Sequence, residues 1–420
     1  MRWSCSIHLI YIAILILIFQ PVLEVAIPAI SYYDEILALL FLGAYLLHIL
    51  KSGKISKSVL KLFLVWSIFV VIGLIGNEKS QSGQPVFLIL IDILANTKLF
   101  MVSIPLFSCL LTTKERKKVV DWLAVTIRLL ILLMFVCAFI SIFIDIGMSG
   151  EVRYGIKSYR FVFANPAGLN TYFYSFMVVF SATLFKDGKL RPKSSLYMVM
   201  AIITWILTLR SRAIAFACIY VLIYVIILRF SSNRKLKFKW YYVPPILMVA
   251  FLIGWPTFEE YFLLNSRQAR YVLLRGAISI AADYFPFGAG FATYGTAASI
   301  AQYSTIYSRY GLANVWGISA SSAYFVMDQY WCGILGQFGI IGLLIMGYMI
   351  FALYKEVLLR SYEESKSTLL ASLTFIYTSL LASISAASYI QASVFISVLV
   401  IFALTAPPAQ RSKNETVIKK

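Results

Sequence analysis

Charged side chains are scarce in this sequence. Asp, Glu, Lys and Arg make up 13% of the 420 residues, whereas hydrophobic residues make up 61%. A soluble globular domain is nearer half apolar and a quarter charged. Because a surface with so little charge cannot stay hydrated, the composition excludes an ordinary soluble protein. It indicates that lipid is the solvent for most of the chain.

Cysteine and histidine are also few. The five cysteines are scattered through or beside apolar segments, and no two of them have the spacing of metal ligands or suggest a disulfide framework. The two histidines, His8 and His48, fall in early apolar segments, toward the side that we predict to be cytoplasmic. We therefore expect no metal site and no histidine base on the outer face.

Long apolar runs fill most of the chain. A helix needs roughly 20 mainly apolar residues to cross a bilayer. We predict membrane helices over residues 7–23, 36–50, 59–76, 86–111, 119–147, 161–185, 196–209, 213–230, 240–258, 330–354, 369–384 and 389–405. The predicted fold is an all-α polytopic membrane protein, a single integral membrane domain over residues 1–420 with about twelve transmembrane helices. Residues 259–325, between the ninth and tenth helices, are predicted to form a large outer loop that contains short helices.

The net charge is +19, which is typical either of nucleic-acid binding or of membrane topology. Nucleic-acid binders usually concentrate their charge on one soluble face. Here every second connection between apolar runs is basic, as cytoplasmic loops are. The basic connections are residues 51–61, 114–118, 186–193, 234–239, 355–366 and 411–420. We predict an even number of spans, both termini in the cytoplasm and no nucleic-acid partner.

Nine basic residues lie in the outward connections that follow residue 147, against that rule. They are Arg153, Lys157, Arg160, Arg210, Arg212, Arg267, Arg270, Arg275 and Arg309. Eight of the nine are arginine, whose planar guanidinium suits phosphate and carboxylate groups. Because the topology rule disfavours arginine in outward connections, these residues must meet some other requirement.

Arg210 and Arg212 join two apolar runs with almost no loop between them, so both lie at the outer interface or slightly inside it. Two arginines at this position with no acidic residue beside them favour an anion site. The alternative is that both side chains snorkel to lipid headgroups.

The outer loop is predicted to contain a helix over residues 266–282. Arg267 and Arg270 are about 60° apart on this helix, and its other positions are apolar nearly all round. We expect membrane helices or lipid to cover it, with the arginines directed into a cavity. The following Gly288-Ala289-Gly290 predicts a tight re-entrant turn, because this Gly-x-Gly does not open a helix in a βαβ unit.

Asp328 comes at the end of the outer loop, just before the next apolar run. Three roles fit an acid at this position: a general base, a helix cap or the partner of an arginine. The glycines Gly333, Gly336, Gly339 and Gly342 recur every three residues after it. Small residues at such spacing predict close helix packing.

Some charged residues fall inside the predicted spans. For Asp92, Lys98 and Arg128 we favour structural pairing, and a proton or ion path is the alternative. At the beginning of the run 161–185, Asn165-Pro166 predicts a break in the early helix. Arg160 just before it is typical of an interface anchor.

Four of these features, in this order, resemble the O-antigen polymerase and ligase superfamily. They are Arg160-Phe161 with Asn165-Pro166 at the start of a span, Ser211-Arg212 between two spans, an outer loop with arginines and then Pro286-Phe287-Gly288-Ala289-Gly290-Phe291, and Asp328 before a glycine-rich span. The likeness covers roughly residues 159–345. The earlier helices contribute hydropathy alone.

The resemblance implies a Wzy-type oligosaccharide repeat-unit polymerase at the outer face of the bacterial inner membrane. Such a glycosyltransferase moves a growing glycan from undecaprenyl pyrophosphate to a new lipid-linked repeat unit, which yields a surface polysaccharide such as O-antigen or capsule. It implies no metal or other cofactor. The implied partners are undecaprenyl-pyrophosphate-linked glycans and membrane lipids, and a chain-length regulator is compatible with it.

On this resemblance the donor's leaving group is a pyrophosphate, which arginine forks would hold. The expected contacts are Arg210, Arg212, Arg267 and Arg270, with Arg160 and Arg275 as second choices. Asp328 is the expected base that takes the proton of the acceptor sugar hydroxyl.

Two other functions stay open. Ligases of the superfamily, which transfer finished glycan to lipid A-core, tend to have a histidine near the position of Asp328. This sequence has no outer histidine, which favours the polymerase. A lipid-linked oligosaccharide flippase also has many helices and basic cavities. Transporters, however, usually have related halves and charges near the midplane, and this chain has no evident internal repeat.

Overall fold

The computed structural model describes residues 7–53, 55, 57–103, 113–186, 189–229, 244, 248, 255, 259, 268–362 and 364–405. Eleven of the twelve predicted runs coincide with helices in this part of the chain. The ninth run, residues 240–258, lies outside the described residues apart from three isolated positions, and so does Arg267. The prediction of a mainly helical membrane protein is confirmed.

The longer helices are α1 (Ile7–Ala26), α2 (Tyr33–Ser52), α3 (Lys57–Ser80), α4 (Val86–Ser103), α6 (Thr113–Phe143), α7 (Pro166–Ser181), α8 (Pro192–Ile206), α9 (Ser211–Arg229), α11 (Ala269–Asp283), α14 (Tyr330–Tyr362), α15 (Lys366–Ser383) and α16 (Ala392–Leu404). The short helical elements are η1 (Pro28–Tyr32), α12 (Ala297–Ala301), α13 (Thr305–Arg309), η4 (Leu312–Asn314) and η5 (Ser388–Ile390). Two short hairpins complete the described part, β1 (Ser149–Arg153) with β2 (Ile156–Tyr159) and β3 (Phe185–Lys186) with β4 (Lys189–Leu190).

Seven helical segments of the described residues are long and apolar enough to cross a membrane. They are α1, η1 with α2, α3, α4, α6, α9 and α14. This establishes a multi-pass membrane protein, but it does not establish the predicted count of twelve spans. The helices α7, α15 and α16 are largely buried against other helices, and α15 buries hydroxyl residues such as Ser372, Thr374 and Thr378. A helix surrounded by protein can use small polar residues for close packing, so it carries a weaker hydropathy pattern than a helix in lipid.

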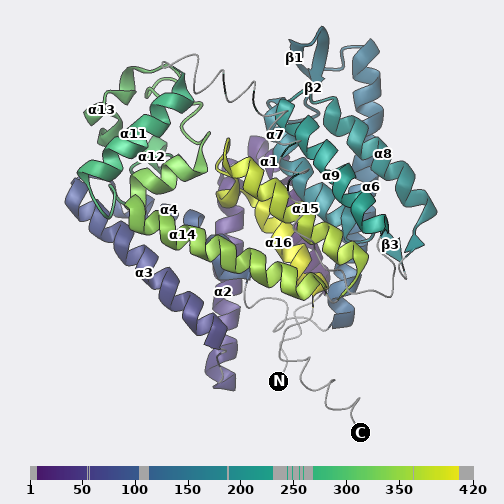
Figure 1. Ribbon diagram of the computed structural model, residues 1–420, viewed down its shortest axis with the longest axis horizontal. Helices are drawn as coiled ribbons and strands as arrows, with labels where there is room; N and C mark the ends of the chain where they lie inside the picture. The colour runs from purple at the N-terminus through teal and green to yellow at the C-terminus, as the bar shows by residue number, and fades with distance from the viewer. Residues whose placement is uncertain are drawn as a thin grey trace.

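Figure 1 shows how the helices are arranged around α14, which crosses the molecule obliquely. On one side, α11, α12 and α13 lie beside the upper end of α3. On the other side lie α6, α8 and α9, with α15 and α16 between the two groups. Contacts of α14 with α3, α11 and α15 join the groups into one body.

The segment predicted as the outer loop has a hydrophobic core of its own. Leu273, Ala277 and Ile280 of α11 are buried together with Tyr307 and Leu312 from the short helices that follow. The predicted helix over residues 266–282 is confirmed as α11, whose described bounds begin at Ala269. The expectation that it is covered is confirmed on one side, where α11 packs along α14, whereas Arg275 and Ile278 on other sides of the helix are exposed.

The helix ends meet in two sets. At one end, the Tyr159 N–H donates to Leu207 O at 2.9 Å and the Ala387 N–H donates to Met327 O at 2.9 Å. The first bond joins the connections that carry Arg160 and Arg210, and the second joins the segment before α14, which carries Asp328, to the α15–η5 connection, whose Ser385 accepts from Arg212. At the opposite end, the Phe185 N–H donates to Ser367 Oγ at 2.8 Å. The arginine-rich connections therefore gather at one end of the helices.

The stretch between α6 and α7 differs from its prediction in two ways. It contains the β1–β2 hairpin, whose turn residues Tyr154 and Gly155 have φ of 52° and 79°. Turns with two such residues match the twist of paired strands. In addition, Asn165-Pro166 does not break a helix but begins α7. Asn165 Oδ1 accepts the Gly168 N–H at 2.8 Å, and proline at the first helical position needs no hydrogen-bond partner.

The glycines between α14 and the loop before it allow close packing, as predicted. Gly339 has a φ of 61°, and a Cβ there would collide with Pro286 O. At Gly288, with a φ of 72°, a Cβ would lie 2.5 Å from Gly339 N. At Gly336, a Cβ would lie 2.6 Å from the Tyr294 ring. The re-entrant turn can therefore lie directly on the α14 backbone, and it places α11 next to the start of α14.

Substitution of Gly339 tests this contact. We expect Gly339→Ala to lower the thermal unfolding midpoint of the detergent-purified protein, because a left-handed backbone and a backbone collision together cost on the order of 1–3 kcal/mol. Gly347→Ala in the same helix is the control, since a Cβ there meets nothing within 4 Å. Equal midpoints for the two variants would contradict the close approach.

Candidate active site

The centre of the candidate site is an ion pair between Asp328 and Arg270. Arg270 lies in the first turn of α11, and Asp328 lies two residues before α14. The Nε and Nη2 atoms of Arg270 donate to Asp328 Oδ2 at 3.2 and 2.9 Å. Both side chains are mostly buried, 22% and 27% exposed. Of the three roles predicted for Asp328, the structure contains that of arginine partner, which does not exclude proton transfer.

Arg210 and Arg212 approach the same carboxylate from the α8–α9 junction. Leu209 in this junction has a φ of 50°, and α9 begins at Ser211. The Nη1 atom of Arg212 donates to Ser385 Oγ at 2.9 Å and to Ser385 O at 3.4 Å. Arg210 Nη2 donates to Glu151 Oε1 of β1 at 2.7 Å. The junction is thereby tied to the hairpin on one side and to the α15–η5 connection on the other.

The electrostatics of Asp328 show that these groups form one cluster. Burial raises the pKa of Asp328 above its ordinary value of 3.8, and it is the largest influence. Arg270, then Arg212 and Arg210, act in the opposite direction and lower the pKa, without cancelling the effect of burial. Three of the predicted arginines and the predicted acid therefore lie close enough to interact, although they come from distant parts of the sequence.

Arg160 and Arg275, the second choices for the pyrophosphate, lie in other settings. Arg160 donates to the backbone carbonyls of Ala164 at 3.0 Å and Gly147 at 3.1 Å, so it closes the loop before α7. Arg275 is exposed, and it lies about 140° around α11 from Arg270. The structure brings neither of them into the ion pair. Arg309 also has a structural position, since it donates to Ser80 O at 2.6 Å and so caps α3.

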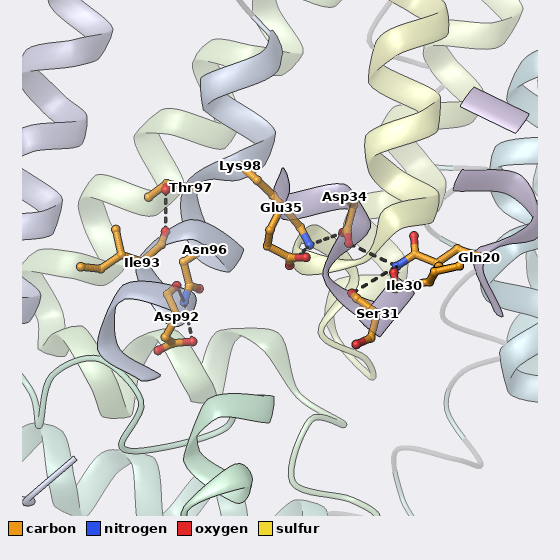
Figure 2. A network of polar contacts seen from close by, with 10 residues as sticks. All are labelled: Gln20, Ile30, Ser31, Asp34, Glu35, Asp92, Ile93, Asn96, Thr97 and Lys98. Carbon is orange, nitrogen blue, oxygen red and sulfur yellow. Dashed lines mark hydrogen bonds and ion pairs between the residues drawn. The ribbon is translucent and has the colours of Figure 1, made fainter. Parts of the chain in front are cut away.

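The charges inside the spans are paired in part, as predicted. Figure 2 shows Lys98 of α4 between the two acids that begin α2. Lys98 Nζ donates to Asp34, and to Glu35 Oε1 at 2.6 Å. Gln20 of α1 donates to Asp34 Oδ1 at 3.3 Å. This network links α1, α2 and α4 inside the protein, where an unpaired charge would be costly.

Asp92 and Arg128 have neutral partners instead. Asp92 Oδ2 accepts the Ala292 N–H at 2.7 Å and Gln337 Nε2 at 2.8 Å, which fixes the re-entrant turn to α4 and α14. Arg128 donates to Thr183 Oγ1 at 2.9 Å. The favoured interpretation of structural pairing thus holds for Lys98 as an ion pair, whereas Asp92 is held by hydrogen bonds alone.

Two residues that contact the candidate arginines were not predicted. Glu151 is one of few acids in the outward connections, and its position two residues before Arg153 could have indicated a charge partner. Ser385 lies in a stretch of small polar residues between two apolar runs, a pattern that indicates close packing but no particular partner. Spatial proximity to Arg212 follows from the packing of α15 against α9, which the sequence does not show.

Within the described part of the chain, no group of three or more His, Cys, Asp or Glu side chains could hold a metal ion. No protein-family model and no curated protein sequence matches this chain. What the site can do is therefore inferred from its own chemistry, which is a cluster of guanidinium groups around a mostly buried carboxylate.

The raised pKa of Asp328 predicts a pH dependence of stability. Because the folded protein holds this proton more tightly than the unfolded chain, protonation stabilises the fold below the ordinary pKa of 3.8, and this contribution is lost as the pH rises through the higher folded pKa. We expect the unfolding midpoint of the wild type to fall, relative to that of Asp328→Asn, over this interval. Arg270→Gln should extend the loss to higher pH, because Arg270 lowers the pKa. Parallel midpoints of the wild type and Asp328→Asn at all pH values would contradict the assignment.

Proposed function

We propose that this chain is a membrane glycosyltransferase that polymerises undecaprenyl-pyrophosphate-linked oligosaccharide repeat units into a surface polysaccharide. The reaction takes place at the outer face of the bacterial inner membrane, with both termini in the cytoplasm. The observation that carries the proposal is a cluster of guanidinium groups around the Asp328 carboxylate at one end of the helices. Arg153 and Arg210 pair with Glu151, and Arg270 pairs with Asp328.

Arg212, next to them, bonds a neutral serine. A cluster of guanidinium groups at a membrane interface favours an anionic ligand. A lipid-linked pyrophosphate is a dense anion at that same interface, and its prenyl chain can remain in the bilayer. Two of the motifs that resemble the O-antigen polymerase and ligase superfamily, Ser211-Arg212 and Asp328 before the glycine-rich span, fall on this cluster, which agrees with that ligand.

Arg212 is the best placed pyrophosphate contact. The Nη1 atom bonds Ser385, and neither Nε nor Nη2 forms a hydrogen bond within the described residues. Those two atoms form the edge of the guanidinium that suits two phosphate oxygens. Arg210 adds charge from the neighbouring turn. As the bond from the sugar C1 to the pyrophosphate oxygen breaks, the oxygen keeps the electron pair, and these arginines offset its growing charge.

Asp328 is the base in this proposal. The acceptor sugar hydroxyl forms the new bond to C1 and transfers its proton to the carboxylate. The two hydrogen bonds that Arg270 donates to Asp328 both end on Oδ2, so Oδ1 can accept the proton while Oδ2 keeps the side chain in position. The pKa of Asp328, raised by burial, makes this carboxylate a better base than an exposed aspartate. Arg270 is then a positioning residue for Asp328 as well as a source of positive charge.

Complementation of a deletion strain tests the pyrophosphate contact. We expect the strain to display single repeat units, and Arg212→Ala to fail to restore polymer although the protein inserts normally. Its loss should be roughly 100-fold or more, as for other donors to a developing anion. Arg212→Lys should remain impaired, because an ammonium cannot form the bidentate contact. Lys157→Ala is the control, since this exposed residue pairs with Asp145. Full-length polymer from Arg212→Ala would refute the assignment.

The role of Asp328 is tested in proteoliposomes with lipid-linked repeat units. We expect Asp328→Asn to bind the donor as the wild type does and to lose transfer by about 100-fold to 10,000-fold, the usual contribution of a general base. The comparison variant is Asp283→Asn, whose carboxylate accepts a hydrogen bond from Tyr310 Oη at 2.8 Å. Near-normal transfer by Asp328→Asn would place the base elsewhere, with Asp283, Glu259 and Glu260 the remaining candidates.

A lipid-linked oligosaccharide flippase is the second candidate, favoured by one observation. Lys98, Asp34 and Glu35 form a charged cluster inside the spans, and charges in the membrane are typical of transporters. The same deletion strain separates the candidates. Loss of a polymerase leaves surface glycan of a single repeat unit, loss of a flippase leaves none, and loss of a ligase leaves finished polymer on its carrier lipid.

A further inference from the structure

Two arginines meet toward the end of the helices that is opposite the candidate active site. Arg128 lies in the middle of α6, and Arg191 directly precedes α8, which packs against α6. Arg128 Nη2 donates to Thr183 Oγ1 at 2.9 Å, and the Arg191 N–H donates to Leu184 O at 3.2 Å. Both arginines are therefore attached to the same connection, the one between α7 and α8.

The two guanidinium groups lie close enough for their charges to repel each other. The Nε atom of each is buried, and neither has a hydrogen-bond partner within the described residues. None of the ion pairs in the described part of the chain includes Arg128 or Arg191. Asp121, about two turns earlier in α6, attracts Arg128 less than Arg191 repels it. Two like charges with unpartnered N–H groups together favour an anionic ligand at this position.

The beginning of α8 adds positive potential to the same place. This helix has 15 residues, and its N-cap Arg191 makes no side-chain cap hydrogen bond. The first N–H groups of a helix and its dipole attract phosphate groups. Lys193 in the first turn of α8 and Lys189 in β4 are both exposed nearby in the sequence. A guanidinium pair beside a helix N-terminus is suited to phosphate, whose oxygens accept hydrogen bonds from several donors at once.

Exposed apolar side chains continue from the two arginines along both helices. On α6, Val125 and Leu129 are 53% and 60% exposed. On α8, Leu196 and Val199 are 59% and 49% exposed. A phosphate group beside such a surface matches the two parts of an anionic phospholipid, because basic pockets between membrane helices bind lipid headgroups. A free phosphate ion would use the arginines but not the apolar surface.

We propose that Arg128 and Arg191 bind the phosphate of one anionic phospholipid between α6 and α8, with its acyl chains along the exposed apolar side chains of these helices. The lipid offsets the repulsion between the two arginines and joins α6 to the α7–α8 connection, so it stabilises the folded protein. The proposal does not depend on the glycosyltransferase activity, because this site and the cluster around Asp328 lie at opposite ends of the helices.

The test is lipid-dependent thermal unfolding of the full-length protein in detergent, with native mass spectrometry to measure lipid binding. The probes are phosphatidylglycerol, phosphatidylcholine, which has a phosphate but no net charge, and inorganic phosphate. We expect phosphatidylglycerol to raise the wild-type midpoint until the site is saturated, as linkage requires for a ligand of the folded state. Phosphatidylcholine should raise the midpoint much less, and inorganic phosphate should not raise it. Equal responses to the two lipids, or a full response to inorganic phosphate, would overturn the proposal.

Arg191→Gln separates a ligand contact from a structural one. Its side chain forms no hydrogen bond within the described residues, so without lipid the variant should unfold at the wild-type temperature or above it, because a like charge is removed. Its affinity for phosphatidylglycerol should fall at least about ten-fold, as expected when charge-assisted hydrogen bonds are lost.

Lys193→Gln is the matched control, because it removes the same charge from an exposed position two residues away. It should keep most of the affinity for phosphatidylglycerol, whereas a general attraction between lipid and positive charge would weaken both variants alike. Equal losses in Arg191→Gln and Lys193→Gln, or wild-type affinity in Arg191→Gln, would exclude the arginine pair as the lipid site.

Discussion

A charged side chain inside the bilayer costs about 2.5–3.5 kcal/mol even by the lowest measures, unless a partner or water offsets it. In this chain specific ion-pair and hydrogen-bond partners offset the cost of the buried charged residues. Lys98 pairs with Asp34 and Glu35, which join α2 to α4. Asp92 holds the re-entrant turn through Ala292 and Gln337. Each buried charge therefore joins elements that hydrophobic packing alone would leave free to slide, because lipid is as apolar as the helix surfaces.

The same constraint explains the position of the candidate site. In the proposed function the site lies at the membrane interface, where water and headgroups reduce the cost of charge, so a cluster of arginines can remain there before the anion binds. The outer loop carries Arg270 to Asp328 because the glycine turn lies directly on the α14 backbone at Gly288 and Gly339. The α8–α9 junction brings Arg212 to the same place and Ser385 orients it. A site built from four connections is thus held by the cores of two neighbouring helix groups.

The sequence was sufficient to predict the helices, because lipid solvation leaves a strong apolar pattern. It predicted α11, the packing role of the glycines and three arginines that cluster with Asp328. The sequence did not predict features that depend on local turn geometry or on contacts between residues far apart in the chain. The hairpin at Tyr154 and Gly155 depends on local turn geometry, and the partners of Lys98 and Asp92 depend on which helices are neighbours. Of the helices that do not qualify as membrane spans, α15 is buried in protein and need not be apolar throughout, whereas α7 and α16 are short, with 16 and 13 residues.

The central claim is that the arginines at this end of the helices bind a lipid pyrophosphate. Its most direct test is the affinity of the protein in nanodiscs for a short-chain prenyl pyrophosphate, compared with the corresponding prenyl alcohol and with the Arg212→Ala variant. The account predicts tight binding of the pyrophosphate that weakens at high salt, little binding of the alcohol, and an affinity at least about ten-fold lower in the variant, since charge-assisted hydrogen bonds contribute about 1.5–3 kcal/mol each. Equal affinity of the wild type for the pyrophosphate and the alcohol would contradict it.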